Sequence, residues 1–147
     1  MSDDTTLRIE RIFDASPEAV FQLWTQREAM EFWYRDGPDF HVNVAELDVR
    51  PGGQYRIEFG PKGQPPYIEH GVYLEIDPPR RLVMSETIEG VDFPWSDTRV
   101  TVEFHGDDGK TRLVLTHEHF PSVSHRDAAA GGWPGFLDRI EQLLRRA

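Results

Sequence analysis

The chain of 147 residues contains no cysteine. This absence excludes a disulfide framework, a thiolate zinc site and a cysteine nucleophile. No apolar run approaches the ~20 residues that a membrane-spanning helix requires. Residues 1–4 are acidic, whereas a secretion signal begins with basic and then apolar residues. The sequence therefore predicts a cytoplasmic protein with no membrane partner.

Several catalytic and binding motifs are also missing. The chain has no phosphate-binding glycine loop, dinucleotide fingerprint or GxSxG elbow, so we expect no cofactor and no serine nucleophile. It has no helical HExxH metal motif either. His117 and His119 could share a strand face, with His70 as a third ligand, but Pro121 indicates that this strand is ending. We therefore expect no metal site.

The charge balance excludes further classes of binding partner. The 16 Lys and Arg residues face 26 Asp and Glu residues, which gives a formal net charge of −10. Such a surface repels phosphate backbones and anionic membranes, so we expect no nucleic-acid partner. Hydrophobic residues make up 38% of the chain and aromatic residues 12%, enough for a sizeable core. The length fits one domain over residues 1–147.

Hydrophobic periodicity predicts the order of the elements. Polar and apolar residues alternate over residues 6–13, which indicates a strand. Ser16 as N-cap and Pro17 at the first helical position predict a short helix, and residues 27–32 predict a second. From there to residue 118, strand-length segments alternate with turn residues, which favours consecutive antiparallel pairing. These six strands are expected over residues 41–48, 53–59, 68–76, 81–88, 98–105 and 111–118.

The end of the chain returns to a helical pattern. Apolar residues from Trp133 to Leu144 recur at three- and four-residue steps. Gly131, Gly132 and Pro134 resist a continuous helix, because glycine costs entropy and proline removes a backbone donor. We therefore expect the helix to break or start near Gly132.

Four segments carry a family pattern: FDASPEAVF at residues 13–21, LDVRPGG at 47–53, HGVYLEIDPPRRL at 70–82, and Gly132-Trp133 followed by Leu137. In this order they resemble the START/Bet v 1-like (SRPBCC) superfamily, within it the AHSA1-like branch named after the C-terminal domain of the activator of Hsp90 ATPase. The resemblance implies an α+β helix-grip fold, with a seven-stranded curved antiparallel sheet around a long C-terminal helix and two short helices after the first strand. Relatives bind apolar molecules in the intervening cavity, some are cyclases or hydrolases, and the namesake stimulates the Hsp90 ATPase.

Three ionisable residues fall in the apolar phase of the strands: His70, Glu86 and His117. A carboxyl group among apolar neighbours should have a raised pKa, and a nearby imidazole could hold it ionised or share its proton. The side chains assigned to the helix-facing side are Tyr55, Ile57, Phe59, His70, Val72, Leu74, Ile76, Leu82, Met84, Glu86, Ile88, Thr98, Val100, Val102, Phe104, Leu113, Leu115 and His117.

Aromatic residues form the other candidate set. Trp33 and Tyr34 follow the short helices and Phe93 and Trp95 lie in a loop, so they could surround a cavity mouth. An exposed aromatic loop also suggests a dimer contact, and we expect a monomer or a homodimer. Trp133 and Phe136, on the inner face of the last helix, fit either core or cavity wall.

We therefore predict binding of a small hydrophobic ligand, aromatic or polycyclic, between sheet and last helix. A cyclase- or hydrolase-type enzyme is one alternative, with Glu86 and His117 as candidate acid and base. A chaperone-associated interaction protein is another. The ligand-binding residues expected are Trp33, Tyr55, Phe59, His70, Met84, Glu86, Trp95, His117, Trp133 and Phe136.

Overall fold

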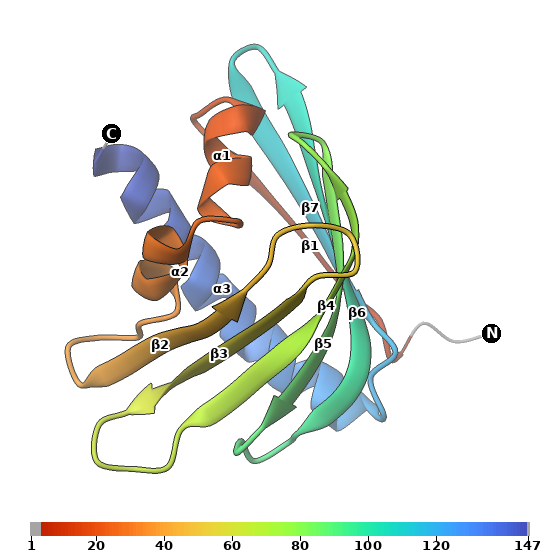
Figure 1. Ribbon diagram of the computed structural model, residues 1–147. Coiled ribbons are helices and arrows are strands. Elements are labelled where there is room, and N and C mark those ends of the chain that lie inside the picture. Colours follow the sequence, from red (N-terminus) through yellow and green to blue (C-terminus); the bar gives the residue numbers. More distant parts are fainter. Residues whose placement is uncertain (1–3, 147) are drawn as a thin grey trace.

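The computed structural model describes residues 4–146 and consists of a curved sheet wrapped around one long helix (Figure 1). All neighbouring strands are antiparallel, in the order β1-β7-β6-β5-β4-β3-β2. This arrangement confirms the helix-grip prediction. The elements are β1 (Leu7–Phe13), α1 (Pro17–Leu23), α2 (Arg27–Trp33), β2 (Phe40–Leu47), β3 (Gln54–Pro61), β4 (Tyr67–Asp77), β5 (Arg81–Glu89), β6 (Trp95–Asp107), β7 (Lys110–Glu118) and α3 (Val123–Arg146).

The start of α1 follows the predicted capping chemistry. The Ser16 side chain accepts a hydrogen bond of 3.2 Å from the backbone N–H of Ala19, and Pro17 occupies the first turn. Helix α1 contacts β6, β7 and α3, and α2 contacts β2 and α3. The two short helices therefore close the space between the sheet and α3 (Figure 1).

Helix α3 is continuous from Val123 to Arg146, so the predicted break near Gly132 is wrong. Pro134 lacks the N–H that would bond to the carbonyl of Ala130. Pro134 is exposed and Ala130 half-buried, so water can reach that carbonyl. Trp133 and Leu137 bury their side chains on either side of the proline. Their packing against the sheet stabilises one helix across the unfavourable residues.

Strand β4 has the opposite phase from the one predicted over its first half. Cross-strand pairing places Glu69 beside buried Ile57, and His70 beside Arg56 on the outer face. The register shifts between Tyr73 and Glu75, which changes the inward phase within the strand. Counting back by twos from the half-buried Ile76 therefore assigns the wrong face to His70, Val72 and Leu74.

Because of Gly71, the sequence does not show which residues of β4 face the helix. Gly71 pairs with buried Tyr55, so it lies on the helix-facing side but has no side chain to mark that side. A Cβ atom at this position would lie 2.0 Å from the backbone oxygen of Ser85. The close approach of β4 to β5 therefore requires glycine here.

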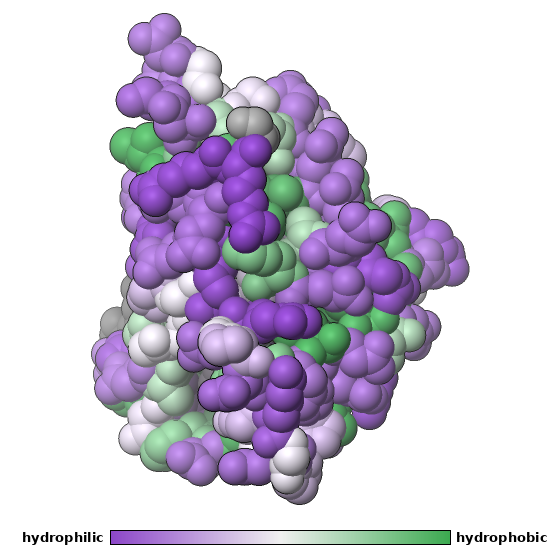
Figure 2. Space-filling model, turned by 90° about the vertical axis from the view of Figure 1, so that its left-hand side faces the viewer, coloured by the Kyte–Doolittle hydropathy of each residue, from purple (hydrophilic) through white to green (hydrophobic). Residues whose placement is uncertain are grey.

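On the other strands, most of the residues predicted to face the helix are buried. The β3, β6 and β7 residues assigned to the inner face are buried, as are Leu82, Met84 and Glu86 of β5. Strand β6 begins at Trp95, three residues earlier than predicted, because Trp95 pairs with Ile88 across a register shift. Hydrophilic residues cover most of the face seen in Figure 2, with hydrophobic residues showing between them.

Aromatic side chains from α2, from α3 and from Trp24, the C-cap of α1, form one end of the core. The Trp24 ring lies 5.1 Å from that of Trp33 and stacks at 6.0 Å on that of Trp133. Phe136 contacts both Trp33 and Trp133 edge to face. These rings fix α3 against α1 and α2, and therefore fix its distance from the sheet.

Candidate ligand-binding cavity

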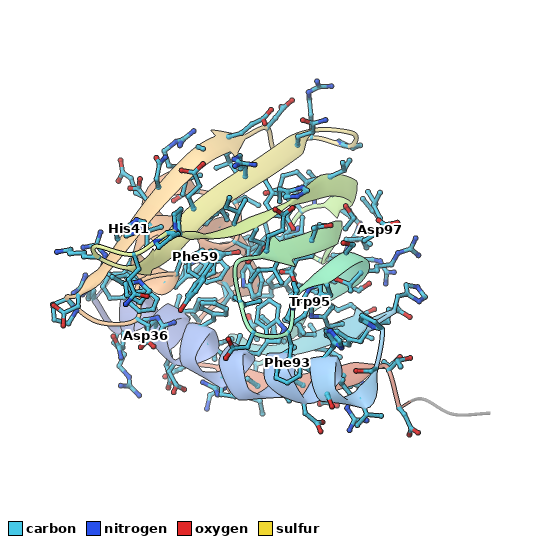
Figure 3. All side chains as sticks on the ribbon, turned by 90° about the horizontal axis from the view of Figure 1, so that it is seen from below. Asp36, His41, Phe59, Phe93, Trp95 and Asp97 are labelled. Atoms are coloured by element: carbon cyan, nitrogen blue, oxygen red, sulfur yellow. The ribbon has the colours of Figure 1, made fainter. Side chains whose placement is uncertain are left out.

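A cavity of about 320 Å³ lies between the sheet and the first half of α3. It forms where the helix presents only Ala128, Ala129 and Gly132 to the strands, before the large Trp133 and Phe136 begin. Phe59 and Trp95 lie between the sheet and the helix in Figure 3. The residues that line the cavity are Phe59, Tyr67, Glu69, Glu86, Ile88, Val91, Asp92, Phe93, Trp95, Ala128, Ala129, Gly132, Trp133 and Phe136.

The loop between β5 and β6 forms the outer wall. Val91, Asp92 and Phe93 of this loop line the cavity, and the last two are exposed. The Phe93 ring makes an edge-to-face contact with His125 of α3, with centroids 5.7 Å apart. The loop therefore lies beside α3 at the mouth, as Figure 3 shows for Phe93.

Two carboxyl groups, Glu69 of β4 and Glu86 of β5, lie together in the mostly apolar wall. Their residues are only 4% and 5% exposed, and the two side chains share a hydrogen bond. The Tyr34 hydroxyl donates to Glu69 at 2.8 Å, and the Trp95 indole Nε1 donates to Glu86 at 3.1 Å. The antiparallel register explains their meeting, because Glu69 pairs with Ile88, two residues beyond Glu86 on the same face.

Burial raises the pKa of Glu69 well above its ordinary value, and the charge of Glu86 and the shared hydrogen bond raise this pKa further. The hydrogen bond from Tyr34 opposes the shift. This shift favours the protonated form of the Glu69 carboxyl group. Glu69 can therefore act as a hydrogen-bond donor in the cavity, toward Glu86 or toward a ligand.

His117 supports the carboxyl pair from behind. It is fully buried, and its Nδ1 accepts a hydrogen bond of 3.2 Å from the Trp133 indole. Its Nε2 lies 2.8 Å from Oγ1 of Thr98 and 3.4 Å from Oε1 of Glu86. The indole can only donate, so the network assigns the proton of a neutral ring to Nε2. Burial lowers the pKa of His117 against the opposing charges of Glu86 and Glu118, which favours this neutral form.

The structure brings together half of the predicted ligand-binding residues. Phe59, Glu86, Trp95, Trp133 and Phe136 line the cavity. Trp33, Tyr55, Met84 and His117 are buried but do not line it. The prediction that Trp33 and Tyr34 surround the mouth is wrong, because both are core residues and the Trp33 indole donates to the Leu23 carbonyl at 2.7 Å.

His70 lies on the outer face of the sheet, where its Nε2 is 3.3 Å from Glu89. The inward placement predicted for it is therefore wrong. It is separated from buried His117 by the sheet, and His119 is exposed beyond the end of β7. Over residues 4–146, no group of three His, Cys, Asp or Glu side chains is placed to hold a metal ion.

Sequence reasoning missed Glu69, the partner of Glu86. One sequence signal could have found it. Tyr67 and Tyr73 share one phase of the strand alternation, and Glu69 and Gly71 lie between them in the same phase. Only the register of β4 against β3 selects this phase over the alternative one.

The comparison with protein-family models shows which family this chain belongs to. The model of the activator of Hsp90 ATPase homolog 1-like protein family matches residues 14–145. The chain belongs to this family. The match extends from the turn after β1 to the last turn of α3, and so includes all the elements that wall the cavity.

Solved structures with the same fold come from several bacteria. Protein CV1439 from Chromobacterium violaceum is 26% identical to this AHSA1-like chain, with a TM-score of 0.83 over 95% of this chain and 96% of that one. An AHSA1-like protein from Aeromonas hydrophila is 22% identical, with a TM-score of 0.77 over 96% and 92% of the two chains. Protein Ms6760 from Mycobacterium smegmatis is also 22% identical, with a TM-score of 0.81 over 97% and 91%. No curated protein sequence matched the chain.

None of the helices within residues 4–146 is both long and apolar enough to cross a membrane. The cytoplasmic location stays a prediction.

Proposed function

We propose that this AHSA1-like chain binds a small hydrophobic ligand, aromatic or polycyclic, in the cavity between the sheet and α3. The observation that carries the proposal is the open volume of about 320 Å³ beside a closely packed aromatic core. Protein interiors contain few voids larger than a water molecule, whereas ligand pockets begin at roughly 300 Å³. The aromatic and aliphatic wall suits an apolar body, and the two carboxyl groups can orient its polar group.

A cyclase- or hydrolase-type enzyme is the second candidate. It is favoured by the position of Glu69, whose pKa is raised, beside Glu86, since a pair of carboxyl groups can donate and accept a proton. His117 is less suited to the acid or base role predicted for it, because both of its ring nitrogens are engaged inside the core. A chaperone-associated role, suggested by the family's name, needs no open cavity, so the cavity favours ligand binding.

Replacing Gly132 with leucine tests the proposal. Gly132 lines the cavity, and a Cβ built there meets no atom within 4 Å, so the larger side chain should occupy the open volume without displacing the backbone. We expect Gly132→Leu to weaken binding of N-phenylnaphthylamine, an uncharged fluorescent probe, by at least about tenfold, which corresponds to ~1.4 kcal/mol. The increase in probe emission on titration with protein measures the affinity.

Gly131→Leu is the matched control. A Cβ at Gly131 also meets no atom within 4 Å, but this residue does not line the cavity. Its variant should bind the probe as the wild type does. Absence of binding by the wild type, or an equal loss in both variants, would rule out this cavity as the site.

A further inference from the structure

The cavity wall has an unbalanced charge. Among the described residues, three carboxyl side chains, Glu69, Glu86 and Asp92, line it, and no Lys, Arg or His does. Within residues 4–146, no ion pair joins Glu69 or Glu86 to a Lys or Arg side chain. His117 lies 3.4 Å from Glu86, but the hydrogen bond it accepts from Trp133 fits the neutral ring. The part of the chain that the structure describes therefore places no Lys or Arg side chain against the carboxyl pair.

The partners that the pair does have are neutral donors. They are the hydroxyl of Tyr34, which donates to Glu69, and the indole of Trp95, which donates to Glu86. Neutral donors compensate only part of the cost of removing a carboxylate from water. A chain selected for stability alone would place an apolar or amide side chain at one of these positions. An ionised carboxyl group at either position places a negative charge inside the cavity, and a cationic ligand would compensate it.

The remaining wall is suited to a cation with an apolar body. Trp95, Trp133 and Phe136 come from two elements and line the same cavity as the carboxyl groups. The faces of aromatic rings attract a cation within about 6 Å, most strongly where water is excluded. A ligand of this kind would place its apolar part against α3 and its charge at Glu69 and Glu86.

We propose that the ligand of this cavity is a hydrophobic amine, whose protonated nitrogen is held by Glu69 and Glu86 and whose aromatic body packs against Trp133 and Phe136. This inference rests on the proposed function and specifies its ligand class. An ammonium group has up to three N–H donors, which the carboxylate oxygens accept in charge-assisted hydrogen bonds. Carboxylate ligands such as fatty acids are excluded by repulsion from the same pair.

Three isosteric probes test the proposal: naphthylethylamine, naphthylethanol and naphthylacetate. They share one aromatic body and differ in the charge of the polar group at neutral pH. Calorimetric titration of the intact protein should give the tightest binding for the amine, by roughly tenfold to a hundredfold over the alcohol, and the weakest for the carboxylate.

The double variant Glu69→Gln/Glu86→Gln should reduce the preference for the amine over the alcohol to about one. Both positions are changed because either carboxyl group alone could still accept hydrogen bonds from the amine. Asp107→Asn, at the exposed last residue of β6, changes the net charge by one unit without touching the cavity and should keep the wild-type preference.

Equal or tighter binding of the alcohol by the wild type would overturn the amine proposal and leave the ligand-binding function intact. A preference for the amine that survives in the double variant would also overturn it. Failure of all three probes to bind would overturn the amine proposal together with the proposed cavity function.

Discussion

Replacing Glu69 with glutamine is expected to stabilise the protein at neutral pH. The residue is 4% exposed, and burial together with the charge of Glu86 raises its pKa. A glutamine amide copies the protonated acid, because its carbonyl can accept from Tyr34 and its NH₂ can donate to Glu86. Burial of this acid opposes folding, so its removal should raise the free energy of unfolding by about 1–2 kcal/mol.

The pH dependence of this gain follows from the direction of the shift. The folded pKa of Glu69 lies above its ordinary value of 4.5, so the folded state binds the proton more tightly than the unfolded chain. The contribution of Glu69 to the free energy of unfolding of the wild type therefore falls as pH rises from 4.5 toward the raised pKa of the folded state. The advantage of Glu69→Gln should appear over this interval, and the two proteins should converge below it.

Denaturant unfolding at several pH values measures this difference. Glu46→Gln is the control, because Glu46 is exposed on β2 and should give little change at any pH. A Glu69→Gln variant that is less stable than the wild type at neutral pH would contradict the assignment of a costly buried acid.

The Trp133→Ala substitution is expected to lower the free energy of unfolding by about 3–5 kcal/mol. The side chain is 7% exposed, stacks on Trp24 at 6.0 Å and donates to Nδ1 of His117 at 3.2 Å. Alanine would enlarge the cavity and leave a buried ring nitrogen without its donor, and both changes destabilise. The midpoint of urea unfolding, at unchanged slope, reports the loss.

Phe93→Ala is the matched aromatic control, since Phe93 also lines the cavity but is 43% exposed. Its loss should change stability by only about 0.5 kcal/mol. Similar losses in the two variants would mean that Trp133 does not connect α3 to the core. Trp133 thus affects folding and binding together, and Gly132 is the cleaner position for testing the cavity.

Much of the fold could be predicted because local signals agree with the global arrangement. Ser16 caps α1 as its position before Pro17 indicates, and the alternation of β3, β6 and β7 marks their buried faces. Strand β4 could not be assigned in the same way. Gly71 has no side chain at an inward position and the strand changes phase near Leu74, so two opposite faces fit the sequence.

The same ambiguity explains why only part of the site could be predicted. Glu86 stands in a clear apolar alternation, but its partnership with Glu69 depends on how β4 pairs with β3 and β5. The continuity of α3 also depends on tertiary contacts. Packing of Trp133 and Leu137 outweighs the local preferences of Gly132 and Pro134, which act over one turn.

Native mass spectrometry of the purified protein tests most directly whether the cavity binds a ligand. Spectra are recorded with and without added N-phenylnaphthylamine, and each is compared with a denatured spectrum of the same sample. We expect one bound small molecule per chain, either copurified or the added probe, which is lost on denaturation and absent from Gly132→Leu. The native spectrum also shows whether the protein is a monomer or a homodimer. A bare mass in every native spectrum, including those with the probe, would contradict a ligand-binding cavity.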